Sequence, residues 1–234
     1  MKAVVLAGGL GTRLRERVPD LPKPMAPVAG RPFLAWLLDA LVRDGLGPIV
    51  LSVGYRWEAI RDHFGAEHRG VALHYAVESE PLGTGGAVAH ALVEGGIGAG
   101  EHVMVLNGDT FLDFDYAAFA RRCESAPAQV AMVLRKVPDT ARFGAVEVSG
   151  GIVTGFAEKG LSGPGLINAG VYILEAGVFE RFGLAGRFSL EADLLQRHLA
   201  ALSPRAFETE GFFIDIGVPA DFDRAQSELP RHAE

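Results

Sequence analysis

The chain has 234 residues, of which 49% are hydrophobic and 22% charged, a composition that supports a substantial core in one domain spanning 1–234. Its formal net charge of −7 argues against a nucleic-acid partner or an anionic membrane surface, because both usually require a basic surface. No apolar run reaches the length of a membrane span, and the single cysteine, Cys123, cannot form an internal disulfide. We therefore expect a protein of the reduced, cytoplasmic compartment.

Strands and helices alternate along the first half of the chain, about 1–135. Apolar runs predict strands at 4–6, 49–53, 103–106 and 130–134, and an alternating pattern predicts one at 71–77. Apolar residues at helical spacing predict helices at 33–43, 57–64, 84–93 and 116–123. Gly45 is placed to cap the first helix at its C-terminal end, and Thr84 is placed to cap the third helix at its start. This alternation predicts an α/β fold with a mostly parallel, doubly wound, Rossmann-like sheet.

The second half, about 136–234, has a different pattern. Its predicted elements are a hairpin of strands 144–148 and 152–156, a strand at 166–174, a helix at 189–202 capped by Ser189, a strand at 212–216 and a helix at 220–227. These elements are expected to add a small β region to the sheet. Since no linker separates the halves, we expect them to form one compact domain.

A glycine-rich loop follows the first strand. The loop and the segment after it contain Leu6, Ala7, Gly8, Gly9, Gly11, Thr12 and the cations Arg13 and Lys23. Glycines let the backbone approach a ligand closely and expose its N–H groups, and neighbouring cations suit a ligand rich in phosphate. A dinucleotide-binding fingerprint is excluded because Leu14 stands where a small residue is needed, and a P-loop is excluded because Arg13 follows Gly11-Thr12. A tight turn without a ligand is the alternative.

Two aspartates stand at the ends of predicted strands. Asp109 follows strand 103–106, and Asp215 lies near the end of strand 212–216. Paired carboxylates suit Mg²⁺, which keeps water and phosphate oxygens as its other ligands. Each aspartate could instead be a solvated turn residue, and Asp109-Thr110 could begin a helix. Asp113-Phe114-Asp115 is a metal motif in many glycosyltransferases, but the helical pattern that follows favours Asp115 as an N-cap.

The opening segment, Leu6-Ala7-Gly8-Gly9-Leu10-Gly11-Thr12-Arg13-Leu14 followed by Pro22-Lys23-Pro24, resembles the sugar-1-phosphate nucleotidyltransferases. Those enzymes join a nucleoside triphosphate to a sugar 1-phosphate and release pyrophosphate. The resemblance extends to Asp215-Ile216-Gly217-Val218-Pro219, with the motifs in the family's order. It implies an enzyme with the nucleotidyltransferase, or GT-A, type of sheet.

The resemblance also implies roles for individual residues. Catalysis is expected of Arg13, Lys23 and Asp109, with Arg13 on the β- and γ-phosphates, Lys23 on the α-phosphate, and Asp109 and Asp215 together holding Mg²⁺. The residues expected to bind the nucleotide are Leu6, Ala7, Gly8, Gly9, Gly11, Thr12, Arg13, Glu78, Pro81, Gly83 and Thr84. Those expected to bind the sugar phosphate are Asn107, Gly144, Glu158, Lys159 and Asn168.

Base and sugar recognition depend on a few of these positions. Guanine offers two adjacent donors that the carboxylate of Glu78 can accept together, whereas uracil offers one donor between two carbonyls, so Glu78 favours GTP. A solvated glutamate is the alternative. Family members usually carry proline after Glu-Lys, but Gly160 follows Lys159 here. Asn168 interrupts an apolar strand and needs a partner, either a sugar hydroxyl or neighbouring backbone.

Several segments resemble, within the family, the D-glycero-D-manno-heptose 1-phosphate guanylyltransferases. They are 22–30, 51–55, 80–87, 166–168 and 170–172. N-acetylmuramate 1-phosphate uridylyltransferases share much of this pattern, and thymidylyl and mannose-specific members follow. A glycosyltransferase that consumes nucleotide sugars and a non-catalytic nucleotide-sensing module are the alternatives from other classes. We expect only small-molecule substrates as partners, and a homo-oligomer is possible.

Overall fold

The structure is a computed structural model that describes residues 1–9, 14, 17–18, 20–126 and 128–233. The predicted site residues Gly11, Thr12 and Arg13 lie outside the described residues.

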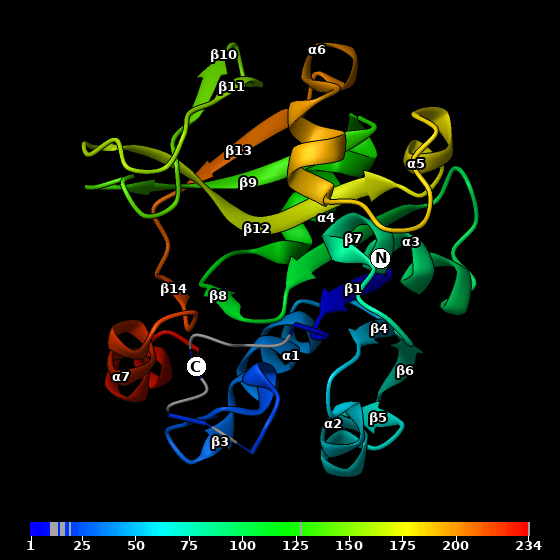
Figure 1. Cartoon of the computed structure of the whole chain (residues 1–234), viewed down its shortest axis with the longest axis vertical. Helices are drawn as coiled ribbons and strands as arrows, with labels where there is room; N and C mark the ends of the chain where they lie inside the picture. The colour runs from blue at the N-terminus through cyan, green and yellow to red at the C-terminus, as the bar shows by residue number, and fades with distance from the viewer. Residues whose placement is uncertain (10–13, 15–16, 19, 127, 234) are drawn as a thin grey trace.

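A ten-stranded sheet runs through the molecule (Figure 1). Its strands, in spatial order, are β10 (Val146–Ser149), β11 (Ile152–Phe156), β13 (Arg205–Thr209), β9 (Val130–Val137), β12 (Gly165–Glu175), β7 (His102–Asn107), β1 (Ala3–Leu6), β4 (Ile49–Val53), β6 (Val71–Val77) and β5 (Glu67–His68). Strands β7, β1, β4 and β6 are parallel neighbours, and β9 and β13 form a further parallel pair. Strand β12 is antiparallel to both β7 and β9 and therefore joins the two parallel groups.

Helices cover both faces of the sheet, which explains why its central strands are apolar on both sides. Val5 of β1 packs in one core cluster and Val4 in the other, since successive side chains of a strand point to opposite faces. The first cluster includes residues of α1 (Phe33–Arg43), α2 (Trp57–Phe64), α4 (Tyr116–Ser125) and α7 (Pro219–Glu228). The second includes residues of α3 (Gly83–Glu94), α5 (Val178–Arg181), the π-helical turn η3 (Leu190–Gln196) and α6 (Leu199–Leu202). The predicted doubly wound α/β fold is confirmed.

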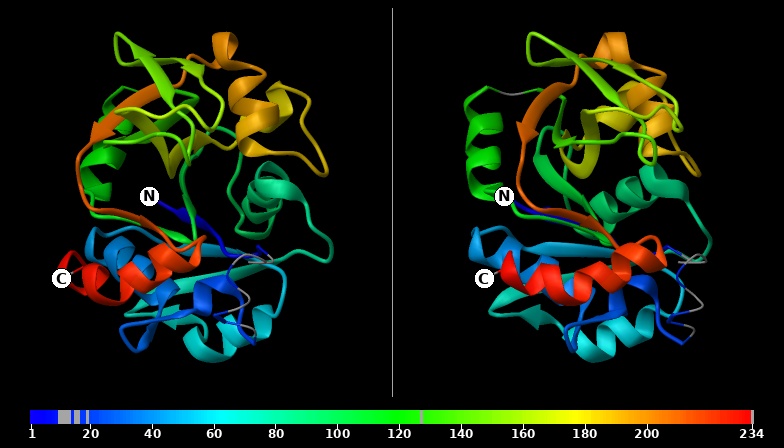
Figure 2. Two further views of the ribbon diagram at one scale, coloured as in Figure 1. Left: turned by 60° about the vertical axis from the view of Figure 1, so that its left-hand side comes forward. Right: turned by 90° about the vertical axis from the view of Figure 1, so that its left-hand side faces the viewer.

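The end of the chain returns to its beginning. Figure 2 shows α7 lying against the region of α1 in both views. Gln226 of α7 accepts a hydrogen bond from Ala29 N (3.0 Å) and donates one to Pro27 O (3.0 Å), next to the small hairpin of β2 (Pro27–Val28) and β3 (Arg31–Pro32). Two 3₁₀ turns, η2 (Lys23–Met25) and η4 (Leu229–Arg231), lie near the two ends of the chain. Within the described residues, every helix is too short or too polar to cross a bilayer.

Three predicted helix ends are confirmed and one is wrong. After α1, Gly45 has φ +72° and donates to Val42 O at 3.0 Å, as expected for a C-terminal glycine. Asp115 caps α4 by accepting from Ala118 N (2.7 Å), and Ser189 caps η3 by accepting from Ala192 N (3.1 Å). Thr84 does not cap α3, which begins at Gly83. The first N–H groups of α3 find another acceptor, because the N–H groups of residues 85 and 86 donate to Phe188 O (3.0 and 3.2 Å).

The second half contains elements that the hydrophobic pattern did not predict. The hairpin of β10 and β11 is confirmed, but the helix expected at 189–202 divides into η3 and α6, and the short, half-buried strand β13 follows. In the first half, strand β8 (Thr110–Leu112) was also not predicted. It pairs antiparallel with β14 (Phe213–Asp215), and this pairing sets Asp215 opposite Thr110. A pairing between segments a hundred residues apart therefore brings the two candidate metal ligands together.

Candidate active site

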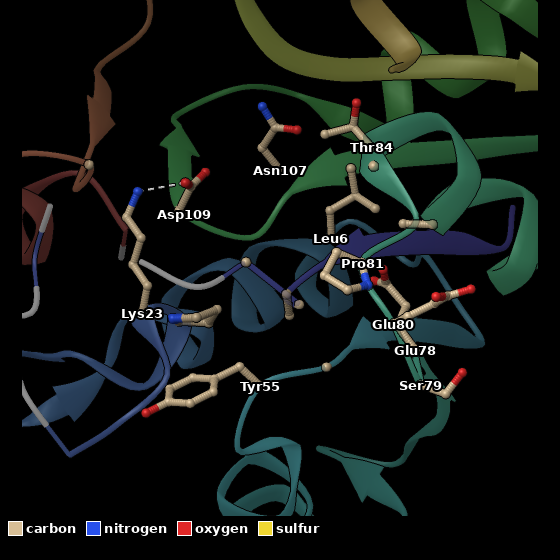
Figure 3. Close-up of a pocket in the computed structure, with 18 residues that line it drawn as sticks. Leu6, Lys23, Tyr55, Glu78, Ser79, Glu80, Pro81, Thr84, Asn107 and Asp109 are labelled. Carbon is tan, nitrogen blue, oxygen red and sulfur yellow. Dashed lines mark hydrogen bonds and ion pairs between the residues drawn. The ribbon is translucent and has the colours of Figure 1, made fainter. Parts of the chain in front are cut away.

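A cavity of about 700 Å³ opens at the carboxyl ends of four adjacent parallel strands (Figure 3). We call it the nucleotide cavity. The residues that line it are Leu6, Ala7, Gly8, Gly9, Lys23, Pro24, Gly54, Tyr55, Glu78, Ser79, Glu80, Pro81, Gly83, Thr84, Ala87, Asn107, Asp109 and Gly217. Strand β1 lies between β4 and β7, so the order of the strands changes direction at β1. A crevice forms at this switch point. This is where an α/β sheet binds its ligand.

The cavity contains most of the predicted nucleotide-binding residues and others that the sequence did not single out. The lining residues that were not among the predicted site residues are Pro24, Gly54, Tyr55, Ser79, Glu80, Ala87 and Gly217. Gly54 and Tyr55 directly follow a predicted strand. Ligands bind beyond the carboxyl ends of parallel strands, so considering the residues after every strand would have found them. Figure 3 shows the Lys23–Asp109 pair at one end of the cavity and Glu78, Glu80 and Pro81 toward the other.

Gly8 is required by close packing of the loop against two neighbouring strands. A Cβ atom at Gly8 would lie 2.8 Å from Glu78 Oε1 and 3.2 Å from Gly54 N. A Cβ atom at Gly9 would meet none of the described atoms within 4 Å. Gly8 therefore fits the loop to the protein, whereas Gly9 borders the open cavity, where a ligand can approach the backbone.

Glu78 is held by two protein hydrogen bonds at the end of β6. Its Oε1 accepts from the buried Ser52 Oγ at 3.0 Å, and its Oε2 accepts from Leu82 N at 3.1 Å. Each carboxylate oxygen has two lone pairs, so both oxygens keep capacity for a further donor. The carboxylate is thus fixed in direction and still able to accept from a base.

Lys23 connects the two candidate metal ligands. Its side chain is 9% exposed, and its Nζ lies 2.6 Å from Asp109 Oδ2 and 3.5 Å from Asp215 Oδ1. Backbone pairing holds the aspartates together, since Ile216 N donates to Asp109 O at 3.1 Å. An ammonium group this deeply buried requires carboxylate partners. One cation therefore contacts both carboxylates at the edge of the nucleotide cavity.

The same two carboxylates fit a magnesium ion. No group of three or more His, Cys, Asp or Glu side chains within the described part of the chain is arranged to hold a metal. Mg²⁺ bound with a phosphate ligand needs only one or two carboxylates, because water and phosphate oxygens complete its octahedral coordination. Asp109 and Asp215 supply that donor set, and their contact with one ammonium shows that the two carboxylates face a common cation position.

The predicted sugar-phosphate residues lie beyond the cavity, apart from Asn107. Gly144 has φ +83°, and a Cβ atom there would lie 2.8 Å from Ala157 O and 3.7 Å from Lys159 Cγ. The loop that carries Glu158 and Lys159 therefore packs directly against Gly144. Gly160 has φ +103° and donates its N–H to Ala141 O at 2.8 Å, and a proline can do neither.

Asn168 makes its hydrogen bonds to protein groups. Its Nδ2 donates to Tyr172 Oη (2.6 Å) and Glu191 Oε1 (2.8 Å), and its Oδ1 accepts from Gly170 N (3.0 Å). Burial, together with the nearby Glu191 carboxylate, raises the pKa of Tyr172 well above its usual value, so its hydroxyl stays protonated. Both amide protons of Asn168 are used, and one oxygen lone pair remains. Gly170, with φ +72°, packs against Asn107 and so places this strand beside the nucleotide cavity.

Asp113-Phe114-Asp115 does not line the nucleotide cavity. Asp115 is the N-cap of α4, and both aspartates border a smaller groove with aromatic residues of α4 and β13. Asp115 is therefore used as a helix cap, which argues against Asp113 and Asp115 acting together as metal ligands.

Comparison with known proteins identifies relatives over the whole chain. Residues 2–232 match the family model described as nucleotidyl transferase. The chain is 38% identical to the D-glycero-alpha-D-manno-heptose 1-phosphate guanylyltransferase of Aneurinibacillus thermoaerophilus, over 99% of this chain and 100% of that protein. It is 39% identical to the Campylobacter jejuni protein of the same name, over 95% of this chain and 97% of that protein. The crystal structure of HddC from Yersinia pseudotuberculosis complexed with GMP-PN matches with a TM-score of 0.83 and 35% identity, covering 97% of this chain and 99% of that chain. The chain belongs to the nucleotidyl transferase family.

Proposed function

We propose that this protein transfers a guanylyl group from GTP to D-glycero-D-manno-heptose 1-phosphate and releases pyrophosphate. The observation that carries the proposal is the contact of Lys23 with both Asp109 and Asp215 at the edge of the nucleotide cavity. The two relatives named for this activity, which are similar over nearly their whole length, support the choice of substrate.

In the reaction, an oxygen of the sugar 1-phosphate attacks the α-phosphorus of GTP in line with the bond to pyrophosphate. The new P–O bond forms as the bond to the leaving pyrophosphate breaks, so no covalent enzyme intermediate is needed. The backbone N–H groups of the loop that begins at Gly8 are assigned to the phosphates, and Arg13 is assigned to the β- and γ-oxygens by the family resemblance. Asp109 and Asp215 would hold Mg²⁺, which would supply positive charge at the phosphate oxygens when bound. Lys23, on a flexible four-carbon stem, turns from the carboxylates to the α-phosphate as charge builds there.

Glu78 selects the base in this proposal. The triphosphate lies toward Lys23 and Asp109, which places the base at the opposite end of the cavity, beside Glu78 and Pro81 (Figure 3). The carboxylate accepts both guanine donors, N1–H and the 2-amino group. The GMP-PN complex of HddC supports a guanine nucleotide as the substrate.

The second half supplies the sugar-phosphate site in this proposal. Lys159 binds the phosphate, while Glu158, Gly144, Asn107 and the free lone pair of Asn168 face sugar hydroxyls. The chain works as one domain, with the nucleotide bound by about 1–135 and the sugar phosphate by about 136–234. The cytoplasm, where GTP is available, is its proposed location, and association into a homo-oligomer stays a prediction.

A matrix of four nucleoside triphosphates against several sugar 1-phosphates, assayed by pyrophosphate release, tests the proposal. GTP with the heptose 1-phosphate is expected to give the highest kcat/KM. If UTP with N-acetylmuramate 1-phosphate is the best pair, the substrate assignment is wrong while the reaction class is retained. If Asp109→Asn and Asp215→Asn variants keep full activity, the metal assignment is wrong.

A further inference from the structure

Arg142 contacts the candidate metal ligand Asp215 at Oδ2, whereas Lys23 faces Oδ1. Its Nη2 donates to Asp215 Oδ2 at 3.0 Å and to the backbone oxygen of Asp215 at 3.4 Å. Its Nη1 pairs with the carboxylate of Asp221 in α7. The guanidinium therefore bridges two aspartates, and a planar, forked group is suited to this because its donors point in fixed directions.

Both carboxylate oxygens of Asp215 are thereby fixed in direction. Oδ1 accepts from Gly217 N at 2.7 Å and faces Lys23, while Oδ2 is held by Arg142. A Cβ atom at Gly217 would lie 2.8 Å from Asp215 Oδ1, so the backbone closes tightly around this side chain. The rotation of the carboxylate is defined by two donors from separate parts of the chain.

Arg142 also belongs to the loop that leads to the proposed sugar-phosphate site. It lies two residues before Gly144, whose backbone packs against the loop of Glu158 and Lys159. Its guanidinium stacks on Phe143, 4.8 Å from the ring centre, and Phe143 in turn contacts Phe213 of β14 edge to face. One residue thus connects the sugar-phosphate loop to the strand that carries Asp215.

We infer that Arg142 is a positioning residue that orients Asp215 for the metal ion, with Asp221 as its anchor. The inference rests on the proposed function, in which Asp215 and Asp109 hold Mg²⁺. In this assignment Arg142 acts through Asp215 and is not itself a ligand of the metal or of the reacting phosphates. Residues that orient metal ligands typically contribute 10- to 100-fold to metal affinity, so losing Arg142 is expected to weaken metal binding by roughly 10-fold or more.

The test measures Mn²⁺ binding by electron paramagnetic resonance to the full-length protein with GTP and without sugar 1-phosphate, so that no turnover is needed. Arg142→Met, which keeps the stem and removes the donors, is expected to raise the Kd for Mn²⁺ roughly 10-fold or more. Arg142→Lys is expected to recover part of the loss, because an ammonium reaches one aspartate but cannot bridge two. Under saturating Mn²⁺ the KM for the sugar 1-phosphate is expected to stay unchanged.

Arg224→Ala is the matched control. Arg224 pairs with the same Asp221 at 2.8 Å and with Glu228, but its contacts do not include Asp215. We expect its Kd for Mn²⁺ to equal that of the unaltered protein. If Arg142→Met and Arg224→Ala have the same Kd for Mn²⁺, the positioning role is wrong. A raised KM for the sugar 1-phosphate with unchanged Mn²⁺ binding would instead make Arg142 a phosphate ligand and overturn the inference.

Asp215→Asn separates this inference from the proposed function. If Asp215→Asn binds Mn²⁺ as tightly as the unaltered protein, Asp215 is not a metal ligand and both assignments fail. If Asp215→Asn weakens binding while Arg142→Met does not, only the inference fails. If both single variants weaken Mn²⁺ binding, adding Arg142→Met to Asp215→Asn should weaken it little further, because the two residues act through one carboxylate.

Discussion

The nucleotide cavity and the sugar-phosphate loops are held in place in different ways. Around the cavity, side chains stand at the carboxyl ends of four parallel neighbours, so the register of the sheet brings them together. The loops of the proposed sugar-phosphate site, 138–145 and 157–164, are joined by scattered hydrogen bonds in place of a sheet register. They include Ala157 N to Ala145 O and Gly160 N to Ala141 O, both 2.8 Å, and Thr140 N to Gly163 O at 3.0 Å. In the cavity, substitution of a side chain should therefore change binding or catalysis while the fold is kept. In the loops, a substitution that changes the backbone should alter the conformation of the loop itself.

Lys23→Met is expected to have the largest effect. Removing the cation that stabilises developing charge should lower kcat by roughly 10²- to 10³-fold, as the loss of one such donor does in other enzymes. Binding of Mn²⁺ should not weaken, because the ammonium that contacts Asp109 and Asp215 has gone. Steady-state kinetics and Mn²⁺ titration check both. A Lys23→Met enzyme with normal kcat would show that the cavity uses a different cation.

Gly8→Ala and Gly9→Ala form a matched pair in the same loop. At Gly8 a methyl group meets Glu78 Oε1 at 2.8 Å and backbone of β4, so we expect a loss of about 1–3 kcal/mol in the free energy of unfolding. At Gly9 the methyl group meets no described atom within 4 Å, and the stability should be unchanged while GTP binding weakens. Urea unfolding and nucleotide titration separate the two. Equal stability losses would mean that the loop packs as one unit.

The two regions also differ in how far the sequence predicted them. The apolar runs at 4–6 and 49–53 specified β1 and β4, because strands buried on both faces have few alternatives. The alternation at 71–77 specified β6, which is exposed at every other position along much of its length. The pairing of β8 with β14 was not predicted, since each has three residues and their partners are a hundred positions apart. Arg142 was not singled out in the sequence either, because its partners Asp215 and Asp221 lie 73 and 79 positions further along the chain. Thr84 was misassigned because its cap preference is local, while the segment near Phe188 is a distant competitor.

Gly160→Pro tests the sugar-phosphate loops. Although related enzymes usually carry proline after Glu-Lys, Gly160 here has φ +103° and donates to Ala141 O, and proline permits neither. We expect a loss of about 1–2 kcal/mol of stability and a raised KM for the sugar 1-phosphate, with the KM for GTP unchanged. Gly160→Ala, which keeps the N–H, is the control and should lose less. An unaffected proline variant would show that the loop can adopt the other geometry.

Glu78→Gln is expected to have the smallest effect and to fall on selectivity alone. The amide can satisfy both existing partners, because its oxygen can accept from Leu82 N and its nitrogen can donate to Ser52 Oγ, so the fold should be retained. It cannot accept two guanine donors side by side, and the charge that disfavours uracil carbonyls is gone. We expect the ratio of kcat/KM for GTP over UTP to fall by roughly 10-fold. If the ratio is unchanged while stability falls, Glu78 serves to fix the loop after β6 and the base is selected elsewhere in the cavity.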